Sequence, residues 1–356
     1  MSRIDAFLEL GVKQGGSDIH LVSGQPPRIR IHGAVEPVRF RELSVEDVNR
    51  MLGELLTDAL RAELEERRSV DFAYPVEGIG RFRVNVFHHT RGLGAVFRVI
   101  PEEVTPLEEL GLPDSVTALA TRGKGLTLVT GPTGSGKSTT LAAIVDRINR
   151  TRRGHIITIE DPIEFVHPFK KCVVTQREIG SHAPSFAEAL RNAVREDPDV
   201  ILVGEMRDLE TISLALTAAE TGIQVLATLH TSGAVRTIDR IINVFPARRQ
   251  DQVRAMLAES LRLIVSQQLV RTADGQGRIL AAEVMVNTPA IASMIRSGKA
   301  HQLASAIQTG GSAGMQSLDS QLRRLVEGGA ISGEEAWRHA LDKAPFDTYA
   351  ARREVA

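Results

Sequence analysis

The chain has 356 residues, of which 42% are hydrophobic and 24% charged, an ordinary globular balance that excludes wholesale disorder, collagen and a coiled-coil rod. Its 43 basic and 44 acidic side chains, its 4% of aromatic residues and its single cysteine exclude a basic nucleic-acid module, an intrachain disulfide and a zinc site of CxxC pairs. Because no apolar stretch approaches roughly 18 residues and the first positions carry several charges, we expect a cytoplasmic protein rather than a membrane-spanning or secreted one.

Residues 1–100 are predicted to form a small mixed α+β domain. Helical patterns and short extended runs follow one another at residues 3–14, 19–22, 28–31, 45–55 and 58–67. Residues 81–87 alternate with period two, so their apolar side chains share one face of a strand while Arg81 and Arg83 share the other. Arg98 lies on the next predicted strand, 95–100. Residues 101–113, with three prolines and two pairs of glutamates, are predicted to be an interdomain linker.

Residues 114–356 change to an alternation of apolar strands and helices. The expected elements are 126–130, 137–149, 156–159, 185–195, 200–203, 209–220 and 225–229. This strand–helix rhythm is typical of a parallel sheet covered by helices. Beyond it, one long helix is predicted over 248–270. A strand at 279–286 and short helices near 289–297, 317–327 and 333–342 follow.

A phosphate-binding motif joins the first strand and helix of this second domain. The sequence from Gly131 to Ser138 matches GxxxxGK[ST] between a strand and a helix, which an ordinary glycine-rich turn would seldom satisfy. Lys137 is expected to reach the β- and γ-phosphates of ATP, and Ser138 to bind Mg²⁺. The predicted nucleotide contacts are Gly131, Pro132, Thr133, Gly134, Ser135, Gly136, Lys137, Ser138 and Thr139.

Polar residues follow three further predicted strands, where parallel sheets bind ligands. Glu205 follows strand 200–203 and is the candidate for the metal-side carboxylate; the alternative is a solvated loop glutamate. His230 follows strand 225–229, where it either senses the γ-phosphate or is structural. Either Glu164 or Glu160, after strand 156–159, is expected to orient or deprotonate the attacking water.

Asp161 and Pro162 lie within the same acidic segment and allow a different reading. Asp161 could cap a helix that has Pro162 at its first position, since proline is favoured there. That alternative explains Asp161 well and Glu164 less well.

Four ordered segments together carry a family resemblance. They are residues 131–139, 159–167, 197–208 and 227–231. They resemble the Walker A, Asp box, Walker B and His box of the secretion ATPases that power type II secretion and type IV pili. The chain is most similar to the PilT-type pilus retraction ATPases, from about residue 3 to about 345, with further similar stretches at 17–21, 80–85, 237–240, 244–246 and 266–269. The resemblance implies a RecA-like P-loop motor domain, residues 114–356, and a smaller PAS-like N-terminal domain, residues 1–100.

The resemblance also implies partners and a mechanism. It predicts a homohexameric ring that hydrolyses ATP with Mg²⁺ and acts on an inner-membrane platform protein at the pilus base, driving pilin disassembly and twitching motility. It implies that Arg81, Arg83 and Arg98 reach a nucleotide; surface ion pairing is the alternative role. Arg195 and Arg207, which flank Walker B, are the alternative source of positive charge.

The chain departs from the retraction ATPases at one motif. Where the family has Ala-Ile-Arg-Asn-Leu-Ile-Arg-Glu, residues 290–297 differ at Ala292, Ser293 and Ser297 but keep Ile291 and Ile295. In the family this motif belongs to retraction rather than to nucleotide binding. An accessory or regulatory paralogue of the retraction ATPase therefore stays open as an alternative, as does, more remotely, a RecA-type motor acting on DNA.

Overall fold

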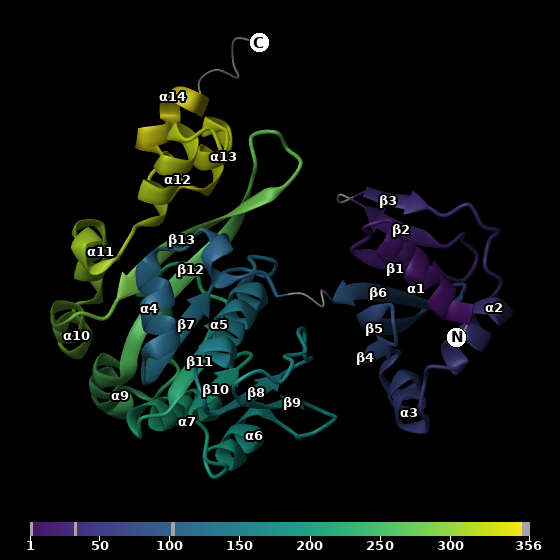
Figure 1. Ribbon diagram of the computed structural model, residues 1–356, viewed down its shortest axis with the longest axis horizontal. Coiled ribbons are helices and arrows are strands. Elements are labelled where there is room, and N and C mark those ends of the chain that lie inside the picture. Colours follow the sequence, from purple (N-terminus) through teal and green to yellow (C-terminus); the bar gives the residue numbers. More distant parts are fainter. Residues whose placement is uncertain (1–2, 32–33, 101–103, 351–356) are drawn as a thin grey trace. The chain divides into compact units, whose positions relative to one another are not determined.

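The computed structural model describes residues 3–31, 34–100 and 104–350 (Figure 1). The chain forms two compact units. The N-terminal unit comprises the residues up to 103 together with Pro162–Val166; the P-loop unit comprises residues 104–161 and the chain from His167 onward. Each unit has its own hydrophobic core.

The N-terminal unit is a six-stranded antiparallel sheet with three helices. Its elements are α1 (Arg3–Lys13), β1 (Asp18–Val22), β2 (Arg28–Ile31), β3 (Ala34–Pro37), α2 (Val45–Gly53), α3 (Asp58–Arg67), β4 (Ser69–Val76), β5 (Gly80–His89) and β6 (Gly92–Ile100). The strands lie in the order β3-β2-β1-β6-β5-β4. The predicted alternation in β5 is confirmed, because Phe82, Val84 and Val86 are 0% exposed while the residues between them are half-buried.

The P-loop unit contains the remaining elements. They are a 3-10 turn (Leu107–Leu110), α4 (Asp114–Arg122), β7 (Gly125–Thr130), α5 (Lys137–Thr151), β8 (His155–Glu160), β9 (Val173–Glu178), α6 (Phe186–Ala193), β10 (Val200–Val203), α7 (Leu209–Glu220), β11 (Gln224–Leu229), α8 (Ala234–Asn243), α9 (Ala247–Ser260), β12 (Leu261–Arg271), β13 (Arg278–Val286), α10 (Pro289–Arg296), α11 (Leu303–Thr309), α12 (Leu318–Glu327), α13 (Gly333–His339) and α14 (Asp347–Ala350), with 3-10 turns at Ala300–Gln302, Gly311–Ala313 and Ala344–Phe346.

A seven-stranded sheet in the order β13-β12-β7-β11-β10-β8-β9 forms the centre of the P-loop unit. Its strands are parallel except β13, which pairs antiparallel with β12. Helices α4 and α5 cover one face of the sheet, and α6 to α11 pack in the core on the other (Figure 1). Helices α12 and α13 form a smaller cluster against Val270 of β12 and Ala281 of β13. Among the described residues, no helix combines the length and apolarity that a membrane crossing requires.

The predicted long helix over 248–270 is wrong in its second half. Helix α9 ends at Ser260, and β12 begins at Leu261 and pairs with β7. Both faces of β12 are buried in its first half, so its apolar run lacks the alternation that reveals a half-exposed strand. A short continuous apolar run cannot be assigned to helix or strand from periodicity alone.

The segment predicted as a linker is partly packed. Residues 101–103 lie outside the described residues, whereas Leu107 is 1% exposed in the core of the P-loop unit. Residues from Val104 onward therefore belong structurally to that unit.

Candidate active site

The P-loop connects a fully buried strand to a long helix. All six residues of β7 are buried, and α5 begins at Lys137. Gly136 precedes the helix with φ +86° and supplies no side-chain cap, so the first N–H groups of α5 have no capping side chain. Such a helix start favours a bound phosphate, through N–H groups that no side chain caps and through its partial positive charge.

The Lys137 side chain folds back over the loop. Its Nζ donates hydrogen bonds of 2.9 Å to the carbonyl oxygens of both Gly131 and Pro132, and the residue is 9% exposed. Ser138 and Thr139 follow in the first turn of α5 and are half-buried, while residues 132–134 of the loop are exposed. The ammonium group thus lies against the loop that the sequence predicts to bind phosphates.

The sheet brings the predicted polar residues to the same edge as the P-loop. Because β7, β11, β10 and β8 are adjacent parallel strands, their carboxyl ends present in turn the P-loop, His230, Glu205 and Glu160. Neighbouring strands lie about 4.8 Å apart, so Glu205 follows a strand roughly 10 Å from the P-loop strand.

Glu205 lies between the side chains of an arginine and a histidine. Arg207 donates to its Oε2 at 2.6 Å, and Nε2 of His230 lies 3.2 Å from its Oε1. Burial by itself raises the pKa of the Glu205 carboxyl, but the hydrogen bond from Arg207 and the charges of His230 and Arg207 outweigh it and hold this pKa below its ordinary value. Glu205 is therefore a carboxylate at neutral pH, and the His230 side chain is 42% exposed beside it.

The second acidic segment is divided between the two units. Glu160 ends β8, where its Oε1 accepts hydrogen bonds from Thr158 Oγ1 at 2.7 Å and Gln176 Nε2 at 3.3 Å. Glu164 belongs to Pro162–Val166, which groups with the N-terminal unit. The chain forms no helix between β8 and β9, so there is no helix start for Asp161 to cap. The capping alternative is therefore wrong.

The three N-terminal arginines lie on one polar sheet face. Arg83 and Arg98 are register partners across β5 and β6. Arg98 Nε donates to Asp18 Oδ1 at 2.9 Å, and Arg83 Nε lies 3.7 Å from Asp71 Oδ1. Arg81, on the same strand as Arg83, is half-buried. Arg98 thus has a close acidic partner within its own unit.

The two arginines that flank Walker B differ in their contacts. Arg195 bonds Asn192 Oδ1 at 2.7 Å on the exposed surface, whereas Arg207 contacts Glu205 directly. The structure therefore brings the positive charge of Arg207, which the sequence ranked second, to the polar edge of the sheet.

Strand β12 contributes contacts that the sequence did not predict. Gln267 Nε2 donates to the carbonyl oxygen of Ser135 inside the P-loop at 2.8 Å. Ser266 Oγ accepts from the N–H of Gly233, at 2.7 Å, in the loop that follows His230. The only sequence signal for these residues is the family resemblance at 266–269, which assigns no function to them.

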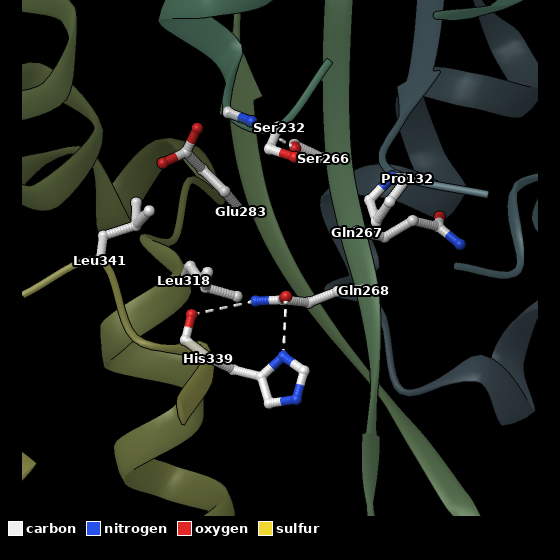
Figure 2. Close-up of a pocket in the computed structure, with 10 residues that line it drawn as sticks. Pro132, Ser232, Ser266, Gln267, Gln268, Glu283, Leu318, His339 and Leu341 are labelled. Atoms are coloured by element: carbon white, nitrogen blue, oxygen red, sulfur yellow. Dashed lines mark hydrogen bonds between the residues drawn. The ribbon is translucent and has the colours of Figure 1, made fainter. Parts of the chain in front are cut away.

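Glu283 of β13 lines a cavity of about 80 Å³ together with Ser266 and Gln267 of β12 (Figure 2). Its Oε1 accepts a 2.7 Å hydrogen bond from the N–H of Ala234, the first residue of α8. Burial raises the pKa of Glu283 above its ordinary value; the Ala234 hydrogen bond opposes this shift and Asp319 adds to it. The folded protein therefore retains this proton to a higher pH than the unfolded chain, and stability falls as pH rises from about 4.3 through the raised pKa.

Glu283→Gln is expected to raise the free energy of unfolding at pH 8 by about 0.5–1 kcal/mol. The amide oxygen still accepts from Ala234, but no charge has to be buried. Urea unfolding of both proteins between pH 5 and 8 measures the difference, which should shrink toward acid because the wild-type carboxyl is then protonated. A gain that grows toward acid would contradict this account.

A model of the Type II/IV secretion system protein family matches residues 1–338. The chain belongs to this family. Among relatives of the secretion ATPase, the type IV pilus retractation ATPase PilT of Pseudomonas aeruginosa is 53% identical over 333 residues, covering 94% of this chain and 96% of that protein. The type IV pilus ATPase PilU of the same organism is 43% identical over 336 residues, covering 94% and 88%.

A solved structure extends this similarity to the fold. A crystal structure of the pilus retraction motor PilT with bound ADP superposes with a TM-score of 0.90 at 45% identity, covering 98% of this chain and 99% of that one. The predicted fold class, a RecA-like P-loop domain with a smaller mixed α+β N-terminal domain, is confirmed. The secretion ATPase described here is a P-loop ATPase, as the motifs predicted.

Proposed function

We propose that this secretion ATPase is a hexameric motor that hydrolyses ATP to power type IV pilus retraction. The single structural observation that supports this is the polar edge of the sheet, where the P-loop, His230 and Glu205 follow three adjacent parallel strands. The 53% identity to a protein named as a pilus retractation ATPase supports the cellular role. The motor acts at the cytoplasmic side of the inner membrane on a platform protein of the pilus base.

The residues present fit ATP and Mg²⁺. The uncapped start of α5 and the ammonium group of Lys137 offer donors to phosphate oxygens. Ser138 and Glu205 supply the oxygen ligands that Mg²⁺ prefers. Within the part of the chain that the structure describes, no group of three or more His, Cys, Asp or Glu side chains could hold a metal alone, so phosphate oxygens and water would complete the coordination. When bound, Mg²⁺ would neutralise charge on the β- and γ-phosphates.

Two glutamates are candidates for activating the attacking water. Glu160 lies at the same sheet edge as Glu205, but Thr158 and Gln176 already bond one of its oxygens. Glu164 lies in the segment that groups with the N-terminal unit, and we retain it as the second candidate. His230, 3.2 Å from Glu205, would report the state of the γ-phosphate to that carboxylate.

In the proposed ring, arginines of one subunit complete the site of its neighbour. Arg81 and Arg83 are the preferred candidates, since both lie within residues 80–85, one of the stretches that resemble the retraction ATPases. Such an arginine stabilises charge that develops on the transferred phosphoryl group and is worth about 10³–10⁵ in rate.

Mixing Arg81→Ala with Lys137→Ala should restore ATPase activity if Arg81 acts on a neighbouring subunit. Each pure variant ring lacks one component at every site, whereas random exchange makes about a quarter of the interfaces intact in a head-to-tail ring. Phosphate release is measured after subunit exchange, which is shown independently by light scattering and labelled subunits. No recovery above either parent, despite exchange, would contradict action across the interface.

An accessory paralogue of the retraction ATPase is the second candidate function. It is favoured by the departures on α10, where Ser293 and Ser297 are exposed and Ala292 is half-buried, while the matching Ile291 and Ile295 are buried. Ser293 and Ser297 therefore change the surface at this helix, whereas Ala292 packs against the core of the P-loop unit. The identity of 43% to PilU against 53% to PilT supports the primary motor instead.

Deleting the gene tests the proposed function. A retraction motor predicts cells with an excess of surface pili and no twitching, because pili still assemble but are not withdrawn. Cells without pili would indicate an assembly ATPase and overturn the proposal. Normal twitching, with loss only under load or together with a second deletion, would support the accessory paralogue.

A further inference from the structure

Three consecutive residues of β12 contact three separate parts of the P-loop unit. Ser266 accepts from Gly233 after the His230 loop, and Gln267 donates to Ser135 of the P-loop. Gln268 Nε2 donates to the carbonyl oxygen of His339 on α13 at 3.3 Å, and Gln268 Oε1 lies 2.9 Å from Nδ1 of the same histidine. Figure 2 shows Gln268 directed toward His339 and Gln267 directed the other way, toward the side of Pro132.

Gln267 holds the P-loop at two points. The residue is 2% exposed, and its amide nitrogen must face the Ser135 carbonyl, because a carbonyl oxygen only accepts hydrogen bonds. Its backbone lies against the first glycine of the loop: a Cβ added to Gly131 would lie 2.2 Å from the Gln267 carbonyl oxygen. The loop is therefore in contact with β12 both at its beginning and at Ser135.

The hydrogen bond to Ser135 fixes the direction of one peptide group. In a trans peptide the C=O and the following N–H point in opposite directions. Since the Ser135 carbonyl points toward Gln267, the N–H of Gly136 points away from β12, on the side where loop N–H groups bind phosphate. Gly136 has φ +86° and no side chain to resist rotation of this peptide, so the contact with Gln267 restrains it.

We propose that Gln267 is a positioning residue for ATP binding: by holding the Ser135 carbonyl it keeps the Gly136 N–H directed at the phosphates. This inference rests on the proposed phosphate-binding role of residues 131–139. Without the amide donor, the buried Ser135 carbonyl loses its partner and the peptide rotates more freely. The loop contacts phosphate both in the bound ground state and in the transition state. Removing the Gln267 amide should therefore mainly raise the KM for ATP and lower kcat less.

The test compares Gln267→Met and Gln267→Glu with Gln268→Met as the matched control. Steady-state ATPase kinetics should give a KM for ATP raised about tenfold in Gln267→Met, with kcat within about threefold of wild type. Gln267→Glu should raise KM further, because its carboxylate donates nothing and faces the Ser135 carbonyl oxygen. Gln268→Met, on the opposite face of the same strand, should leave KM within about twofold.

Melting temperatures without nucleotide separate positioning from general packing. Wild-type KM in both Gln267 variants, or an equal rise of KM in Gln268→Met, would overturn the inference. If Gln267→Met does not fold, the near-isosteric Gln267→Glu decides alone. Failure of the phosphate-binding role of residues 131–139 is a distinct outcome, since the wild-type chain would then hydrolyse no more ATP than Lys137→Ala.

Discussion

Replacing Lys137 by alanine is expected to lower ATP hydrolysis at least 100-fold, because the loop loses its only positively charged side chain. Nζ of Lys137 lies 2.9 Å from two loop carbonyls, so its ammonium group lies against the loop that the sequence predicts to bind phosphates. Its removal weakens binding of the β- and γ-phosphates and leaves the charge of the transition state less stabilised. Phosphate release and nucleotide binding by the purified variant measure the two effects.

Lys124→Ala is the matched control for this experiment. Lys124 is exposed and immediately precedes β7, at the end of the strand opposite the P-loop. Its removal deletes the same charge at the end of β7 that lies away from the P-loop, so activity should stay within about twofold of wild type. Activity of Lys137→Ala within tenfold of wild type, or an equal loss in Lys124→Ala, would contradict the assignment of the phosphate site.

The local pattern of the P-loop could be predicted because its signals lie within a few residues. The strand, the glycine-rich turn and the helix that begins at Lys137 are encoded consecutively, and the structure forms them at β7 and α5. The order of strands in the sheet is a different property. That β11 lies between β7 and β10, and so places His230 beside Glu205, depends on pairing between distant segments and has no local signal.

The contacts of β12 could not be predicted for the same reason. Its apolar first half reads equally as a buried helix, and only pairing with β7 decides the outcome. A helix over these residues gives no reason to place Gln267 against Ser135, which lies 132 residues earlier in the chain. The contact of Arg207 with Glu205 is local, but opposite charges two residues apart are too common to indicate a site by themselves.

Glu205→Gln is expected to retain ATP binding while hydrolysis falls about 100-fold or more. The amide keeps the size of the carboxylate, so β10 and its loop should fold normally, but it removes the negative charge that faces Arg207 and His230. Because the Glu205 pKa lies below its ordinary value, the wild-type group is charged throughout the neutral range, and the loss should be equal at pH 7 and pH 8. Lys137→Ala should weaken binding as well, which separates the two roles.

Glu220→Gln provides the control for this charge change, since Glu220 is exposed at the end of α7 and should leave turnover unchanged. Equilibrium binding of ATP and single-turnover hydrolysis, measured on the same preparations, distinguish binding from chemistry. Wild-type turnover in Glu205→Gln would contradict the assignment of Glu205 to the active site. Loss of ATP binding together with hydrolysis would show that the Glu205 carboxylate, with its contacts to Arg207 and His230, is needed to form the nucleotide site rather than to position the metal or the attacking water.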